Sequence, residues 1–275
     1  MNTAPTEIVI ESRRRPRLLH ELGEVWRYRE LLRVLVRRDI TVRYKETWLG
    51  VFWAVLQPVA LMTVFWFALG RVLRVSTGEL PYPLFVLAGL LPWTFFSTAI
   101  SSSMGSLVGA SHLIQKVYFP RLIIPLSTLG VPFLDFAIGA AILAAVFAWL
   151  KLLAPGAMLA LLPLLLIGLA AIALGTLSAA LAASYRDTRH MIPLVMQVWM
   201  FATPVFYPAD IVVESMRWAI DFNPMAPLID SFRRALVGAP LDWAGCGRSG
   251  FFFAAMLWCA TWFFMRVERR LSDTL

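Results

Sequence analysis

The sequence predicts an all-α polytopic membrane protein, and two observations carry that prediction. Of its 275 residues, 59% are apolar and only 15% are charged, whereas soluble domains carry about 25% charged residues. The apolar residues also fall in long runs that are nearly free of charge, as in bilayer-spanning segments. Because backbone N–H and C=O groups in hydrocarbon must be paired within their own segment, we expect these runs to be helices.

Six of the runs are long enough to cross a bilayer, at roughly 20 residues each. We expect these six spans at 50–70, 84–104, 123–150, 157–184, 191–207 and 250–266. The chain then divides into three parts. Residues 1–20 are predicted to be a disordered cytoplasmic tail, residues 21–48 an amphipathic interfacial helix, and residues 49–275 the six-span transmembrane domain.

The orientation follows from the Lys and Arg residues in the loops. Eleven of the 25 precede Trp48, and the loops 105–122 and 185–190 with the C-terminus bring one side to eighteen. The opposite side has seven. Since cytoplasmic loops carry the excess of Lys and Arg, both termini are predicted to be cytoplasmic and 208–249 to face outward. Anionic lipids account for this basic lead-in, so we expect no nucleic-acid partner.

The N-terminal helix is predicted from residues that recur at three- and four-residue steps. A helix of this kind, with basic residues between the apolar ones, lies in the membrane interface with its apolar face toward the lipid. The alternative is a helix packed on a soluble partner. The apolar positions are Leu22, Val25, Trp26, Leu32, Leu35, Val36 and Ile40, and the interleaved cations are Arg27, Arg33, Arg37 and Arg38.

The outward stretch contains more than a simple loop. Pro204 and Pro208 are expected to end the fifth span. Two short apolar segments follow, 212–222 and 225–237, and each is too short to span. We interpret them as two re-entrant helices before the last span that close an outer gate; the alternative is a plain extracellular loop. The candidate gate residues are Trp218, Phe222, Asn223 and Pro224.

The sequence lacks the motifs of several enzyme classes. None of the three lysines is followed by Ser or Thr, so there is no GxxxxGK[ST] phosphate loop. The three histidines have no metal-ligand spacing, and no GxSxG elbow is present. We therefore expect a protein that is not an enzyme and that binds no metal or cofactor of its own.

Asp135 is the clear ionisable residue within a predicted span. Such a residue is a functional hypothesis by default, here a proton relay. The alternative is that the carboxylate pairs with a neighbouring group. Ion-driven flippases and carriers often show internal repeats, and none is evident. An ion-driven flippase therefore remains only a rival interpretation.

Several stretches together resemble one family, the permease subunits of ABC type-2 exporters for O-antigen, teichoic acid and capsular polysaccharides. Their order and spacing, rather than any single motif, carry the resemblance, which covers nearly the whole chain after about residue 20. The stretches are Arg38–Gly50 with Trp53-Ala54 and Leu56–Pro58, Lys116–Arg121, Tyr185–Asp187, Thr203–Pro208, Asn223–Met225 and Glu268–Asp273.

The resemblance implies a homodimer of six-span subunits joined to two separate ATPase subunits, which would bind ATP and Mg. It implies that the dimer moves a lipid-linked polysaccharide, O-antigen above all, through a channel across the bacterial inner membrane. An ABC type-2 exporter of a drug or small lipid shares this topology and remains an alternative.

Two sets of candidate site residues follow from the resemblance and from side-chain chemistry. The resemblance places the ATPase-coupling segment at Gln115, Lys116, Tyr118, Phe119, Pro120 and Arg121, where the alternative is an ordinary basic loop. Aromatic rings on which sugars can stack are candidates for the translocation path, namely Trp53, Trp93, Phe96, Phe201 and Tyr207. Anchoring at the membrane interface is the alternative for these aromatic residues.

Overall fold

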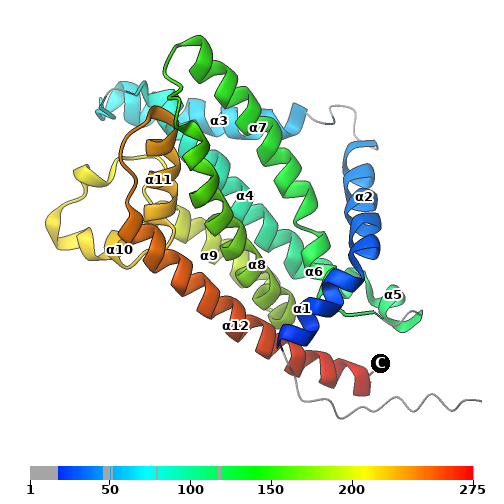
Figure 1. The fold of residues 1–275 in the computed structure, drawn as a ribbon. Coiled ribbons are helices and arrows are strands. Elements are labelled where there is room, and N and C mark those ends of the chain that lie inside the picture. The colour runs from blue at the N-terminus through cyan, green and yellow to red at the C-terminus, as the bar shows by residue number, and fades with distance from the viewer. Residues whose placement is uncertain (1–17, 46–49, 51, 79, 117–118, 275) are drawn as a thin grey trace, which may run out of the picture.

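The structure is a computed structural model, and it describes residues 18–45, 50, 52–78, 80–116 and 119–274. Within these ranges every regular element is helical, which confirms the all-α class (Figure 1). Long helices lie side by side in a bundle, and α1, α5 and the C-terminal end of α12 lie at the same end of it (Figure 1).

The principal helices in chain order are α1 (Leu18–Arg27), α2 (Arg29–Lys45), α3 (Phe52–Phe65), α4 (Tyr82–Gly109), α5 (Ser111–Lys116), α6 (Ile123–Ser127), α7 (Gly130–Trp149), α8 (Leu161–Ser184), α9 (Thr188–Ala202), α10 (Arg217–Asp221), α11 (Ala226–Val237) and α12 (Trp243–Thr274). A π-helical segment, Trp66–Val72, continues α3, and the 3-10 turn Ala157–Ala160 leads into α8. Two further 3-10 turns, Ala209–Ile211 and Glu214–Met216, precede α10.

Five described helical segments are long and apolar enough to cross a membrane, and the expected count of six is not confirmed. The five are Phe52–Val72, Tyr82–Gly109, Ile123–Trp149, Ala157–Ser184 and Trp243–Glu268. The missing one is α9, which has 15 residues. At 1.5 Å per residue it is about 22 Å long, less than the roughly 30 Å hydrocarbon core. It ends at Ala202, just before Pro204, as the proline predicted.

The core is centred on α4, whose spanning window is 72% buried. Its largest enclosed side chains include Trp93 and Phe96, and the helix itself packs on α7, α8 and α11. The close approach of α8 depends on small residues. A Cβ at Gly175 would lie 2.9 Å from the Ser103 Oγ of α4, and Ala171 and Ala179 are fully buried. This face of α8 therefore serves helix packing.

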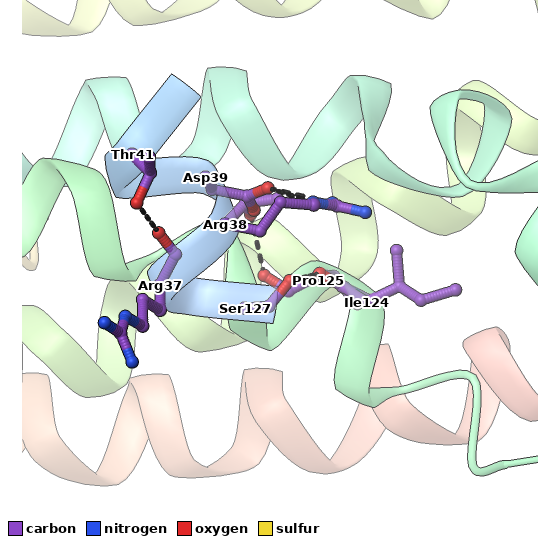
Figure 2. A network of polar contacts seen from close by, with 8 residues as sticks. Arg37, Arg38, Asp39, Thr41, Ile124, Pro125 and Ser127 are labelled. Carbon is purple, nitrogen blue, oxygen red and sulfur yellow. Dashed lines mark hydrogen bonds and ion pairs between the residues drawn. The ribbon is translucent and has the colours of Figure 1, made fainter. Parts of the chain in front are cut away.

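The N-terminal part forms two helices rather than one, with Tyr28 between α1 and α2. Leu35 of α2 is buried, and a Cβ at Gly130 of α7 would collide with Val36. The apolar face of α2 is thus turned toward α6 and α7 of the same chain. Figure 2 shows α2 beside α6, with the Thr41 hydroxyl donating to the Arg37 carbonyl at 2.7 Å. In the same view Arg38 pairs with the adjacent Asp39 at 2.8 Å.

The two short outer segments differ in their burial. Helix α11 places Leu228, Ile229 and Phe232 in the main core, so it is an integral part of the bundle. Helix α10 has only five residues, and on this stretch Trp218 is 64% and Phe222 is 84% exposed. Two helices before the last span are thus present at the expected break, but their re-entrant placement in a membrane is not confirmed.

Candidate functional site

The predicted coupling segment lies against a second apolar cluster at the end of the bundle where α1 and the C-terminal end of α12 meet (Figure 1). We call it the basal cluster. It contains buried side chains from α2, α4, α6, α8 and α12. Because packed interiors are dense, movement of one of these helices displaces the others. Its buried members are Leu35, Leu107, Phe119, Leu122, Ile123, Ile124, Ala179, Ala180, Phe264 and Val267.

The segment divides into an anchored half and an exposed half. Phe119 is 5% exposed within the basal cluster, and Pro120 beside it is also buried. Lys116 ends α5 and is exposed. Tyr118 and the side chain of Gln115 lie outside the described residues. A partner protein can therefore contact α5 and Lys116 directly, whereas Phe119 supports that surface from within.

Arg121 fastens the anchored half to the end of the chain. Its Nη1 donates to the Glu268 backbone carbonyl at 3.2 Å, and its Nε lies 3.6 Å from the Glu268 Oε1. Both side chains are largely covered, with 19% and 28% of their surface exposed. Screening by water is reduced at such a site, so the ion pair is stronger than one on an open surface.

The candidate outer-gate residues do not act as a single group. Asn223 is buried and is the centre of a polar network at the end of α9. Its Nδ2 donates to the Ala202 carbonyl at 3.2 Å and to the Thr203 Oγ1 at 2.8 Å, and its Oδ1 accepts from the Trp199 Nε1 at 2.9 Å. The Asn223 Oδ1 also accepts from the Met225 backbone N–H at 3.0 Å. Pro224 is half-buried beside this network, while Trp218 and Phe222 are exposed.

Arg233 of α11 is the most unusual polar residue of the structure, and sequence reasoning missed it. Its side chain is 3% exposed and donates to three backbone carbonyls, those of Phe85, Pro204 and Val205. The guanidinium also lies 3.9 Å from the centroid of the Phe85 ring. A Cβ at Gly89 would collide with this guanidinium, so the glycine makes room for it.

Arg233 and Asn223 therefore reach the same target from α11 and from the turn before it. That target is the chain break after α9, residues 202–206, where the helix leaves carbonyls without intrahelical partners. Tyr82 of α4 adds a third contact by donating to the Phe206 carbonyl at 2.7 Å. A cation near the end of α9 also suits the negative pole of the helix dipole. We call these contacts the outer clamp.

The aromatic candidates for a translocation path are divided between buried and exposed positions. Trp93 and Phe96 are buried in the core, where both make edge-on contacts with the Trp199 ring. Trp53 and Phe201 are about half exposed, at 51% and 50%, and Tyr207 is partly covered. The structure does not bring the five rings into one row. Trp93 and Phe96 act as core residues within this single chain.

Asp135 has partners on α2, as one of the two alternatives predicted. The Arg43 Nη2 lies 2.8 Å from the Asp135 Oδ2, and the Tyr44 hydroxyl donates to the Asp135 Oδ1. Burial, together with this hydrogen bond, raises the pKa of Tyr44 to about 12, so the phenol remains protonated and donates. The carboxylate therefore ties α2 to α7.

The fold and these contacts define a class of protein: a helical multi-pass membrane protein whose helices are held together by the apolar basal cluster with its Arg121–Glu268 ion pair and by the polar outer clamp. Among the described residues no three His, Cys, Asp or Glu side chains gather at one point as metal ligands would. The chain belongs to the ABC-2 type transporter family, because the model of that family matches residues 30–237.

Relatives of known name are similar over most of the chain. An O-antigen export system permease protein RfbA from Klebsiella pneumoniae is 29% identical over 217 residues, which cover 78% of this chain and 83% of that protein. A protein of the same name from Myxococcus xanthus is 31% identical over 225 residues, 78% and 84% of the two chains. The polysialic acid transport protein KpsM of Escherichia coli is 30% identical over 95 residues, about a third of each chain.

Proposed function

We propose that this chain is the channel-forming membrane subunit of an ATP-driven exporter that moves a lipid-linked polysaccharide, most readily O-antigen, across the bacterial inner membrane. The similarity to O-antigen export permeases over more than three quarters of the chain carries this proposal. Two copies of the chain form the channel, and two separate ATPase subunits bind ATP and Mg and supply the energy.

A topology of six crossings fits this role. Helix α1 packs against α12 at the basal cluster, so the described ends of the chain lie on one side of the bundle. A chain with both ends on one side must cross an even number of times. Five long spans therefore need one more crossing, and α9 with the segment after it is the part available. The bias of Lys and Arg toward the ends makes that side cytoplasmic.

Dependence on a partner ATPase is supported by the sequence, which has no GxxxxGK[ST] loop. The exposed end of α5, with Lys116, lies at the predicted cytoplasmic side and offers the docking surface. The buried residues behind it, Phe119 and Pro120, hold that surface against the basal cluster. ATP-driven movement of α5 then reaches the helices that meet in the basal cluster.

The alternative substrates are a drug or a small lipid. An ion-driven flippase has less support, because Asp135 is held by Arg43 and Tyr44. The extent of similarity to O-antigen permeases favours a polysaccharide over a drug.

The decisive experiment is deletion of the gene from its native bacterium and complementation by the chain. We expect the deletion strain to accumulate lipid-linked glycan on the cytoplasmic face and to lose it from the cell surface. Glycan at the cell surface in the deletion strain, together with altered drug sensitivity, would support the drug-exporter alternative instead. The purified chain alone is expected to hydrolyse no ATP.

A further inference from the structure

Helix α12 contacts α11, which carries Arg233 of the outer clamp, near its first residues, and the basal cluster and Arg121 near its C-terminal end. It has 32 residues, Trp243–Thr274, and is about 48 Å long at 1.5 Å per residue. In Figure 1 it runs from beside α10 and α11 to the neighbourhood of α1. The sequence of α12 contains no proline, so no break of that kind interrupts its hydrogen bonds.

The first turn of α12 is joined closely to α11. The Cys246 thiol donates to the Ser231 hydroxyl at 3.3 Å, and both residues are buried. The Gly245 N–H donates to the Asp242 Oδ1 at 2.8 Å, and a Cβ at Gly245 would lie 2.6 Å from the Pro227 Cβ of α11. The start of α12 therefore cannot shift along its axis without displacing α11, which carries Arg233 of the outer clamp.

The other end of α12 is joined to the coupling segment. Glu268 accepts the Arg121 guanidinium through its backbone carbonyl and its carboxylate. Phe264 and Val267, on the preceding turn, share the basal cluster with Phe119. Along its length α12 packs chiefly on α8, which gives it a long neighbouring helix as support.

From these contacts we infer that α12 transmits movement of the ATPase-coupling segment to the outer clamp, and that Glu268 is the positioning residue that receives it through Arg121. The inference rests on the proposed function for the coupling segment. A packed helix with fixed contacts at both ends moves as a unit, since interiors are dense and shift discretely rather than deform.

Coupling of this kind must be shown by an equilibrium that both ends influence. The two cysteines of the chain, both on α12, provide a reporter. Cys246 is buried against α11, whereas Cys259 is exposed and is removed as Cys259→Ser. In the complex with its ATPase subunits, reconstituted in vesicles, the rate at which a membrane-impermeant thiol reagent on the outer side labels Cys246 reports movement of α12 relative to α11.

We expect a non-hydrolysable ATP analogue to change the Cys246 labelling rate several-fold in the otherwise unaltered complex. Glu268→Arg should remove this response while the ATPase subunits stay bound and hydrolyse ATP, and Arg121→Glu should remove the response as well. The double variant Arg121→Glu with Glu268→Arg should restore the response, because the pair is re-formed with reversed sign. Glu268→Gln is a milder variant for the case in which the charge reversals disturb folding. It removes the charge without adding one and should reduce the labelling response partly.

The matched control is Arg266→Glu, which makes the same charge change as Arg121→Glu. Arg266 is exposed on the last described turns of α12 and lies over the Trp262 ring, 3.6 Å from its centroid. The Arg266→Glu complex should keep the full response of Cys246 labelling to the ATP analogue. A response that survives in both single variants, or that the double variant fails to restore, would overturn the inference. A chain that assembles with no ATPase subunit would instead count against the proposed function.

Discussion

The Arg43 guanidinium lies 2.8 Å from the Asp135 carboxylate, and this contact joins α2 to α7. The Tyr44 hydroxyl donates to the other oxygen of the same carboxylate. An acidic side chain in a predicted span thus has a cation and a phenol as partners, which accounts for its charge without a transport role. The arrangement makes Asp135 a structural residue, and this assignment can be tested.

Asp135→Asn should lower the stability of the protein and leave export working. A hydrogen bond to a charged group contributes about 1.5–3 kcal/mol, and the half-exposed Arg43 places this loss at the lower end. Thermal unfolding in detergent measures it, with Glu30→Gln as the control. Glu30 pairs with Arg33 on an open surface, where such pairs contribute about 0.2–0.5 kcal/mol. Complete loss of export in a stable Asp135→Asn protein would revive the proton relay.

Arg233 and Arg234 are adjacent in α11, and the same substitution should affect them very differently. Arg233→Lys keeps the charge but cannot donate to three carbonyls from a planar group, and each buried carbonyl left unpaired costs about 1–3 kcal/mol. Arg234 is half-exposed and pairs with Asp230, so Arg234→Lys should change stability by about 0.5 kcal/mol or less. Equal unfolding temperatures for the two variants would show that the outer clamp is unimportant.

Phe119 and Lys116 separate the two halves of the coupling segment. Phe119→Ala removes a ring from the basal cluster and should cost about 3–5 kcal/mol of stability, with weaker ATPase association as a consequence. Lys116→Glu changes an exposed side chain, so it should weaken association with the unfolding temperature unchanged. Co-purification of the ATPase subunits and thermal unfolding, measured together, distinguish the two effects. Normal association in the Lys116→Glu protein would remove α5 from the docking surface.

The fold could be predicted from the sequence because its main signals are local. Long apolar runs located the five spanning segments, and Pro204 located the end of α9. The small residues of α8 are a local feature of the same kind, since a Cβ at Gly175 would lie 2.9 Å from the Ser103 Oγ of α4. These features depend on one helix at a time, so hydropathy and spacing are sufficient to find them.

The site was harder to predict because its contacts join residues that are far apart in the sequence. Arg233 lies 148 positions from Phe85 and Arg121 lies 147 from Glu268, and neither pairing leaves a local pattern. Arg233 lies within 208–249, the stretch predicted to face outward, and a buried arginine and an exposed one look alike in a sequence. The resemblance places Phe119 in a segment that contacts a partner, and its aromatic ring suits a partner surface and a core equally.

The proposed topology can be checked by labelling from each side of the membrane. Single cysteines at Lys116 and Arg266 should react with an impermeant reagent only from the cytoplasm, because both residues lie near the basal cluster and are exposed. A cysteine at Trp218 should react only from outside. Oriented inverted and right-side-out vesicles provide the comparison. Labelling of position 218 from the same side as position 116 would rule out six crossings.

The outer gate is best tested with α10 rather than by removing the whole outer segment. Deletion of 212–237 would take Leu228, Ile229 and Phe232 out of the main core and Arg233 out of the outer clamp, so a leak would only report misfolding. Trp218 and Phe222, by contrast, are exposed and lie on the same short stretch. Their replacement by alanine should leave the unfolding temperature nearly unchanged, since surface substitutions away from special features stay within about 0.5 kcal/mol.

If these two rings close the exit in the dimer, the double variant Trp218→Ala with Phe222→Ala should make the resting channel permeable to small ions, measured as conductance in a planar bilayer without ATP. Trp149→Ala is the matched control, because Trp149 is a large exposed ring, 82% accessible, at the end of α7. A tight channel in the well-folded double variant would assign α10 to an ordinary outer loop. Leakage in both variants would show that exposed aromatic residues seal the contact between protein and lipid and that these two rings have no specific role in closing the channel.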